Sequence, residues 1–178
     1  MNLRDFSLSN KVRILLYLAV LPLPWLTEAV LQFPLYSASG ENGGQYVVAI
    51  EGMRSALNHE PVCSWENCGG REKGGSGMLL TAKSLIEVLF PVSIGFLFFA
   101  GISLIKGISI KYLKAVKGIM LAMLLTGYGL ALYGINQLPE NLTGITLTGG
   151  VRTADAVVIY ITLILLVRII FFKKQSGD

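Results

Sequence analysis

Four long apolar segments dominate the pattern of hydrophobic and polar positions along the chain. They cover residues 14–34, 85–105, 118–139 and 151–172, and the third contains no charged residue. A helix needs about 20 mainly apolar residues to cross the hydrocarbon core of a bilayer. Because every segment is long enough, the pattern predicts an all-α membrane protein in which residues 1–178 form a single four-transmembrane-helix bundle.

A polar connection of roughly 45 residues, within residues 35–84, separates the first two apolar segments and is too long to be a simple turn. It begins with the sequence SASGENGG, whose composition is typical of a flexible linker. Beyond it, apolar residues recur at the spacing of one helix face, at Tyr46, Ile50, Met53 and Leu57. We therefore predict a short amphipathic helix that lies along the membrane surface, with a partner-binding helix as the alternative.

Basic residues gather at three places that flank the apolar segments. They fall within residues 1–13, 106–117 and 168–174, and the middle group holds four lysines and no acidic residue. The 35–84 connection instead contains five glutamates. Because segments rich in lysine and arginine stay in the cytoplasm, the pattern predicts that both termini are cytoplasmic and that the 35–84 loop is extracytoplasmic. A bacterial inner membrane is the expected location.

The composition agrees with a membrane protein. Hydrophobic residues make up 53% of the chain, charged residues 15%, and the mean hydropathy is +0.61, whereas soluble domains carry about 25% charged residues. The net charge of +4 would suit nucleic acid only if the basic residues formed a recognition surface. They flank apolar segments instead, so we exclude nucleic acid and expect the lipid bilayer as a partner.

The first apolar segment has a second interpretation. A basic flank, a short apolar region and a following alanine are also typical of a cleaved signal peptide. Against cleavage, apolar residues resume in VLQFPLY, and two prolines interrupt the stretch. We therefore keep residues 14–34 as a membrane span, with cleavage as the alternative.

Cys63 and Cys68 are the only cysteines of the chain. The predicted topology places both outside the cytoplasm, where disulfides persist, and we predict a structural disulfide between them. Redox activity is the alternative, although the usual dithiol spacing is Cys-x-x-Cys and a second cysteine pair is missing. A metal site formed with His59 and Glu66 is a further alternative, but structural zinc takes four protein ligands and His59 is the single histidine of the chain, so no metal is predicted.

Five ionisable residues fall near the predicted outer boundary of the spans: Glu28, Lys83, Glu87, Arg152 and Asp155. Charged residues at membrane depth are candidates for function. They either mark helix ends, with Lys83 and Glu87 as an i,i+4 pair, or form one polar cluster beneath the loop. Glu28 lies deepest, so we predict that it faces the bundle interior. Near the opposite boundary, Arg168 is expected to extend to the cytoplasmic surface.

Small residues recur every four positions in the third apolar segment, in two series. The first series is Gly118, Ala122 and Thr126, and the second is Gly127 and Ala131. Because small residues let helix backbones approach closely, both series predict helix packing.

The sequence contains no nucleotide-binding loop, no Ser/His/Asp set and no metal-binding histidine pair. It therefore predicts a protein without enzymatic activity or cofactor that acts through contacts with another membrane protein or with further copies of itself. An accessory or assembly subunit would fit, as would an immunity protein against a toxin, which shares this layout of spans. The alternatives are a thiol–disulfide oxidoreductase that uses Cys63 and Cys68, and a small channel or transporter subunit that uses Glu28 and the outer polar cluster.

Overall fold

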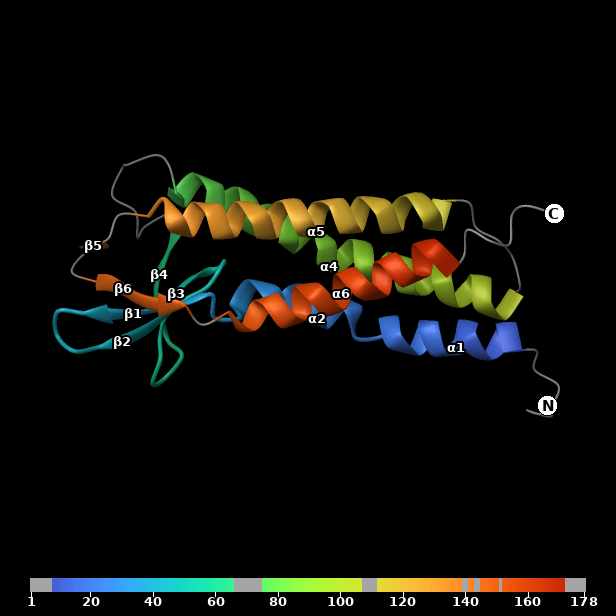
Figure 1. Ribbon diagram of the computed structural model, residues 1–178, viewed down its shortest axis with the longest axis horizontal. Coiled ribbons are helices and arrows are strands. Elements are labelled where there is room, and N and C mark those ends of the chain that lie inside the picture. Colours follow the sequence, from blue (N-terminus) through green and yellow to red (C-terminus); the bar gives the residue numbers. More distant parts are fainter. Residues whose placement is uncertain are drawn as a thin grey trace.

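The computed structural model of the chain describes residues 8–65, 75–106, 112–138, 141–142, 145–150 and 152–171. It consists of a helix bundle with an antiparallel sheet at one end (Figure 1). The helices are α1 (Leu8–Val20), α2 (Leu23–Gln32), α4 (Gly75–Lys106), α5 (Tyr112–Asn136) and α6 (Thr153–Phe171). The strands are β1 (Tyr36–Gly40), β2 (Gln45–Val48), β3 (Gly52–Ser55), β4 (Pro61–Ser64), β5 (Asn141–Leu142) and β6 (Ile145–Gly150).

Four helical stretches are long and apolar enough to cross a membrane, as the sequence predicts: Lys11–Gln32, Gly75–Lys106, Tyr112–Asn136 and Thr153–Ile170. The second begins at Gly75 instead of residue 85, because the polar residues ahead of the apolar segment continue the helix. With 32 residues, α4 is ~48 Å long, against a hydrocarbon core of ~30 Å. It is therefore longer than a bilayer core requires.

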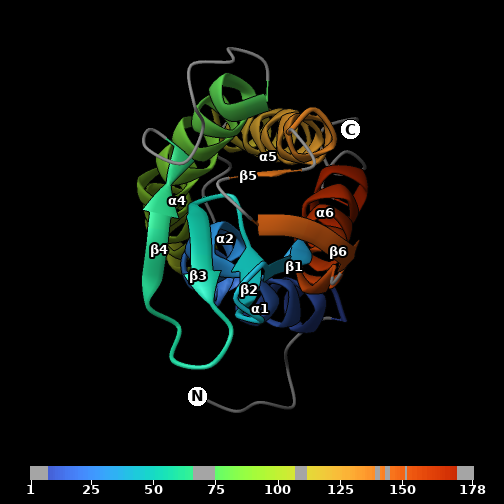
Figure 2. The same ribbon diagram turned by 90° about the vertical axis from the view of Figure 1, so that its left-hand side faces the viewer.

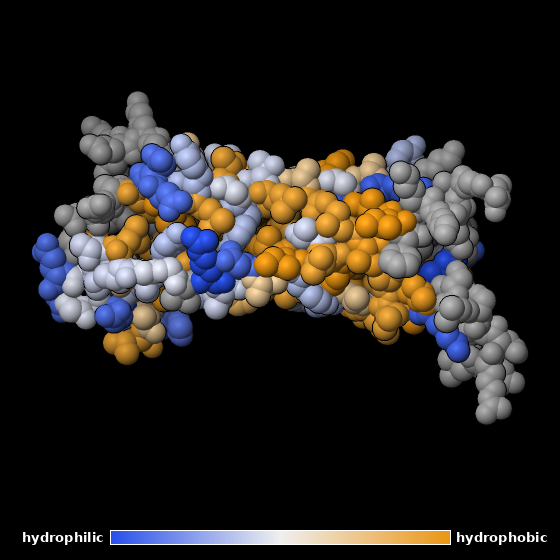
Figure 3. Space-filling model, viewed as in Figure 1, coloured by the Kyte–Doolittle hydropathy of each residue, from blue (hydrophilic) through white to orange (hydrophobic). Residues whose placement is uncertain are grey.

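The beginning of α1 and the end of α6 lie together at one end of the bundle, and the sheet lies at the other (Figure 1). We call these the inner end and the sheet end. Hydrophobic side chains cover much of the helical part, whereas polar ones gather over the sheet (Figure 3). The exposed apolar side chains of the helices include Leu15, Phe98, Ile119 and Leu163. Such a surface is what a helix needs in order to face lipid.

Proline separates the two helices of the first span. α1 ends at Val20 and α2 begins at Leu23, with Pro22 between them. Proline has no backbone N–H to donate, so Pro22 and Pro24 interrupt the helical hydrogen-bond pattern at this point. The chain resumes the pattern at once, since the Leu26 N–H donates to the Pro22 carbonyl at 2.9 Å.

α5 packs closely against α4, and one of the two small-residue series lies in this interface. Gly127 and Ala131 are buried, and a Cβ added to Gly127 would lie 3.1 Å from Cγ1 of Ile86. The second predicted series is therefore confirmed as a packing surface. The series that begins at Gly118 is exposed, and space around the Gly118 Cβ position is open.

The sheet joins the two connections at its end of the bundle. Its strand order is β4-β3-β2-β1-β6-β5, with every neighbouring pair antiparallel. Strands β1–β4 follow α2, whereas β5 and β6 follow α5. The β1–β6 pair links them, with Tyr36 opposite Gly150 and Gly40 opposite Ile145. Seen from this end, the sheet spreads across the bundle (Figure 2).

The sheet shows that the all-α prediction is wrong for this region. No amphipathic helix forms over residues 46–57, because β2 and β3 occupy this stretch with a turn at residues 49–51. The SASGENGG segment is likewise no flexible linker, since it forms β1 and its turn into β2. Gly52 explains part of the difference: its φ is +157°, and a Cβ there would lie 2.5 Å from the Cys63 carbonyl oxygen. Only glycine therefore allows this approach of β3 to β4.

Trp65 connects the end of β4 to the turn between β2 and β3 by hydrogen bonds. Its side chain is 1% exposed, and the indole N–H donates to the carbonyls of Ile50 at 2.9 Å and Ala49 at 3.2 Å. Ile50 and Met53 are buried in the same apolar core, which continues without a break into the helices. The sheet and the bundle therefore share one core.

Candidate functional site at the sheet–helix boundary

Arg152 and Tyr36 meet where α6 begins beside β1. The Arg152 guanidinium donates to the Tyr36 hydroxyl at 3.1 Å, and its Cζ lies 5.8 Å from the centre of the Tyr36 ring. The hydrogen bond to Tyr36 raises the pKa of Arg152, which therefore keeps its charge. Arg152 is exposed, so this contact lies at the surface of the boundary.

Asp155 lies one turn further along α6 and contacts α5. The Tyr128 hydroxyl donates to Oδ1 of Asp155, and the Tyr128 side chain is buried. Asp155 also lies in the first turn of α6, where the helix dipole favours a negative charge. Together with Arg152 and Tyr36, these residues connect β1, α5 and α6.

Lys83 and Glu87 form the ion pair that their spacing on α4 predicts. The Lys83 ammonium lies 3.7 Å from a Glu87 carboxylate oxygen, and both side chains are partly exposed. α4 and α6 lie on opposite sides of the bundle (Figure 2). Among the described residues, no ion pair joins this pair to Arg152 or Asp155. The predicted residues thus lie in two groups.

Glu28 does not face the bundle interior, contrary to the prediction. Its side chain is exposed, as is that of Trp25 one turn earlier. The buried polar residue of α2 is its neighbour Thr27, whose hydroxyl donates to the Pro24 carbonyl at 2.7 Å. Because neighbouring helix positions differ by about 100° in direction, burying Thr27 turns Glu28 outward.

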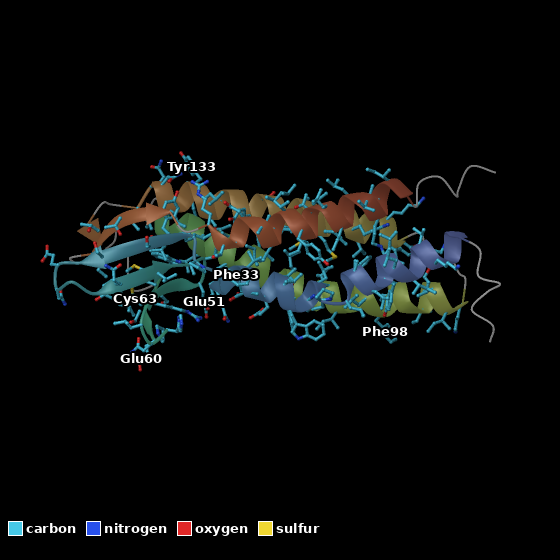
Figure 4. All side chains as sticks on the ribbon, turned by 60° about the horizontal axis from the view of Figure 1, so that its bottom comes forward. Phe33, Glu51, Glu60, Cys63, Phe98 and Tyr133 are labelled. Atoms are coloured by element: carbon cyan, nitrogen blue, oxygen red, sulfur yellow. The ribbon has the colours of Figure 1, made fainter. Side chains whose placement is uncertain are left out.

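Cys63 lies in β4, within the sheet (Figure 4), where it pairs in register with Met53. Cys68 and Glu66 lie outside the described residues, so the predicted disulfide and the alternative metal site remain predictions. Within the part of the chain that the structure describes, no three His, Cys, Asp or Glu residues gather as a metal site.

Two buried cations at the inner end were not among the predicted site residues. Lys117 is 4% exposed and Arg168 is 8% exposed. The prediction that Arg168 extends to the surface is therefore wrong. The helical spacing of the buried residues could have revealed both cations. Arg168 continues the buried face of α6, which is formed by Ala154, Val158, Ile161 and Leu165. Lys117 continues the buried face of α5, which is formed by Met120, Leu124, Gly127 and Ala131.

The boundary residues hold the sheet on the helices by hydrogen bonds that cross between elements. The contacts of Tyr36 with Arg152 and of Tyr128 with Asp155 were not predicted, because the partners are distant in sequence. The arrangement contains a carboxylate, a guanidinium and two phenols, which suit fixed positioning and recognition of polar groups. No protein-family model, curated protein or solved structure matches the chain.

Proposed function

We propose that this protein is a multi-pass membrane protein that acts through contacts with another membrane protein, without catalysing a reaction. In this proposal, the sheet end lies outside the cytoplasm and both termini lie inside it, in a bacterial inner membrane. The four apolar helices support the membrane location, and the basic segments support the orientation. An accessory subunit, an assembly factor or a toxin-immunity protein would use such contacts.

The observation that carries this proposal is the hairpin between β3 and β4. It extends sideways beyond the outline of the helices, with Glu60 near its tip (Figures 1 and 4). Leu57 in the same hairpin is 90% exposed, and Val62 is 45% exposed. These two apolar side chains offer a partner protein an apolar surface beyond the helices. We therefore place the contact with the partner protein on residues 57–62.

The hairpin is an ordered structure, which favours binding because little conformational entropy is then lost. The Ser55 N–H donates to the Glu60 carbonyl at 2.9 Å, and the His59 N–H donates to the Ser55 carbonyl at 3.1 Å. The Asn58 amide donates to the Glu60 carboxylate at 2.7 Å. His59 has a φ of 56°, which completes the tight turn.

Site-specific photocrosslinking in living cells tests the contact. A photoreactive amino acid replaces Leu57 in one variant and Glu41, in the exposed turn between β1 and β2, in the other. We expect a discrete crosslinked product from position 57 and none from position 41. A product of twice the monomer mass indicates a second copy, and mass spectrometry of a product of any other mass shows whether the partner is a membrane protein, as proposed, or a soluble protein, which would contradict the proposal.

A second substitution shows whether the product depends on the hairpin surface. Val62→Asp adds a charge to the exposed surface of the same hairpin and should reduce the product, whereas Glu41→Ala should leave it unchanged. Equal products from positions 57 and 41, or a product that Val62→Asp leaves unchanged, would contradict the proposal.

We also propose that Cys63 and Cys68 form a structural disulfide. The intervening Trp65 is fixed by its two hydrogen bonds, which supports a short covalent ring at this position. Thiol alkylation before and after reduction tests the pairing: both cysteines should react only after reduction. Alkylation of either cysteine in the unreduced, denatured protein would refute it.

The channel alternative receives less support, because it depended on Glu28 inside the bundle and Glu28 is exposed. The oxidoreductase alternative is tested by Cys63→Ser with Cys68→Ser. If the cellular function disappears while the abundance and unfolding temperature of the protein stay normal, the pair is redox-active.

A further inference from the structure

The side of α2 that faces away from the rest of the bundle carries a carboxylate. Trp25, Glu28 and Gln32 follow one another at spacings of three and four residues, which places them on one helix face. All three are exposed, Trp25 to 67%, whereas the other side of α2 packs against α4 and α6. We call Trp25, Glu28 and Gln32 the Glu28 face.

In a bilayer centred on the first span, Glu28 lies within the hydrocarbon core. This span has 22 residues and is ~33 Å long by helical rise, against a core of ~30 Å. Glu28 comes ~6 Å before its end at Gln32. The Cα–Cβ bond of a helical residue tilts toward the helix N-terminus, and α2 begins at the middle of the bundle (Figure 1). The Glu28 side chain therefore starts toward the bilayer centre and away from the water at the sheet end.

The described part of the chain supplies no cation to Glu28. Residues 14–53 contain no Lys, Arg or His, and among the described residues neither a hydrogen bond nor an ion pair reaches the Glu28 side chain. Ionisable groups at membrane depth are costly and almost always pair with another group or face a water-filled cavity. The structure therefore leaves a place beside Glu28 for a cation of another protein.

Glu87 on α4 is an exposed carboxylate in the opposite situation. Lys83 lies 3.7 Å from it on the same helix. α4 begins at the sheet end (Figure 1), so the Cα–Cβ bond of Glu87 tilts toward water. Glu87 thus has a partner within the chain and a short path to water, and it provides a control for Glu28.

A second copy of the chain does not suit the Glu28 face. Most dimers have twofold symmetry, which brings the same patch of both subunits together. With the twofold axis along the membrane normal, the two Glu28 side chains would meet at the same depth. Like charges repel strongly where the dielectric constant is low, so a different protein that carries a cation is the better occupant.

The β3–β4 hairpin lies on the same side of the molecule as this face. It extends sideways past α1 and α2 in both views (Figures 1 and 2), and the face of α2 opposite α4 and α6 is turned to that side. A protein that contacts residues 57–62 outside the membrane would therefore have its membrane-spanning part beside the Glu28 face.

We propose that a transmembrane helix of the partner protein packs against the Glu28 face and places a lysine or arginine beside the Glu28 carboxylate. The ion pair neutralises both charges within the hydrocarbon. Trp25 adds apolar contact area on the side of the bilayer centre, and the Gln32 amide can form hydrogen bonds between the helices. This inference rests on the proposed function and assigns the part of the contact that lies inside the membrane.

Site-specific photocrosslinking of the full chain in living cells locates the partner helix. A photoreactive amino acid replaces Trp25 in one variant and Leu163, which is 56% exposed on α6, in the control. We expect a discrete product from position 25 and none from position 163. Peptide mass spectrometry should assign the crosslinked peptide to an apolar, membrane-spanning segment of a different protein that contains a lysine or arginine.

Several results would overturn the proposal. They are a product of twice the monomer mass, a crosslinked peptide outside a membrane-spanning segment, and a spanning segment without lysine or arginine. A product from position 57 with none from position 25 would also overturn it and would leave the hairpin contact standing. The absence of a product from both positions would contradict the proposed function as well.

The charge of Glu28 is tested in the chain that carries the photoreactive amino acid at position 25. Glu28→Gln should lower the yield of the product at least about tenfold, because it leaves the partner's cation buried without its counter-charge. Glu28→Asp should keep more of the product. Glu87→Gln is the matched control, since it removes the same charge from a carboxylate paired within the chain, and it should keep the yield. Equal losses for Glu28→Gln and Glu87→Gln would overturn the proposal.

An exchange of charges tests the pair itself. Glu28→Lys should abolish the product from position 25, because it places two cations together. Replacing the basic residue of the crosslinked partner segment with glutamate should then restore the product. If the product does not return, while the abundance and the unfolding temperature of the Glu28→Lys chain equal those of the wild type, Glu28 does not pair with that residue and the proposal fails.

Discussion

The sheet end and the inner end of the bundle differ in where they place their cations. At the sheet end, Arg152 is exposed and Lys83 is partly exposed, and they contact a tyrosine and a glutamate within reach of water. At the inner end, Lys117 and Arg168 are buried and contact backbone carbonyls. Exposed ion pairs contribute little energy, whereas buried charges are costly and mark sites of function. The cations of the sheet end therefore stay near water, whereas those of the inner end take part in the packing between helices.

The ends also differ in how they are held together. The sheet end is joined by strand pairing, by the Trp65 hydrogen bonds and by the contacts of Tyr36 and Tyr128. The described part of the inner end consists of helices. Because one apolar core joins the two ends, the following variants test whether a change at one end also changes the other.

Trp65→Ala should have the largest effect on stability. It removes a buried aromatic side chain and both of its hydrogen bonds, and such a change costs about 3–5 kcal/mol. The unfolding temperature in detergent should fall, and limited proteolysis should cut residues 36–65 more readily. Trp65→His can still donate a hydrogen bond from its ring but fills less volume. Its unfolding temperature should lie between those of Trp65→Ala and the wild type.

The same variant sharpens the comparison of the two ends. If the ends are independent, Trp65→Ala speeds backbone hydrogen exchange in residues 36–65 and leaves exchange around Lys117 and Arg168 at the wild-type rate. Faster exchange at both ends would show that they unfold as one cooperative unit and that the comparison fails.

Gly127→Leu should have the next largest effect. The added side chain meets Ile86 and Leu85 of α4, and such overpacking costs about 1–3 kcal/mol. Gly118→Leu is a matched control, because the same substitution on the same helix meets open space. Equal unfolding temperatures for the two variants would show that α4 and α5 do not pack as described.

The four spans could be predicted from sequence because each is a local property of an apolar run. The sheet could not, because its β1–β6 pair joins residues that are far apart in sequence: Ala38 in β1 lies opposite Leu147 in β6. Small residues such as Ser37 and Gly149 gave no apolar alternation, and their contact only becomes visible in the fold. Residues 46–57 show a second limit. Apolar residues from β2, from the turn at residues 49–51 and from β3 recur at the spacing of one helix face, although no helix forms there.

In the candidate sites, too, contacts within one helix were predictable and contacts between helices were not. The Lys83–Glu87 pair was predictable because both residues lie on one helix. The Arg168 carbonyl contact with Lys117 spans two helices, and only the buried stripes of α5 and α6 pointed toward it. Glu28 was assigned by depth alone, and depth does not determine which way a helical side chain faces.

Tyr128→Phe should have a smaller effect than either core substitution. It removes the hydrogen bond to Asp155 and keeps the ring, which costs about 1 kcal/mol for a partly buried pair. Asp155→Asn keeps an acceptor and should cost less. Thermal unfolding measures both effects. If Tyr128→Phe lowers the unfolding temperature as much as Trp65→Ala does, the boundary contacts stabilise this end more than the sheet core does.

Glu28→Leu should have the smallest effect, within about 0.5 kcal/mol of wild type, as is usual at exposed positions. Its neighbour provides the control: Thr27→Val removes the buried hydroxyl that donates to the Pro24 carbonyl and should cost about 1 kcal/mol. Both changes make α2 more apolar. A difference between their unfolding temperatures therefore reports which side chain is buried and not which is more hydrophobic. Unfolding temperatures that fall for Glu28→Leu and stay constant for Thr27→Val would return Glu28 to the bundle interior, restore the channel alternative, and give the sheet end a buried charge of its own.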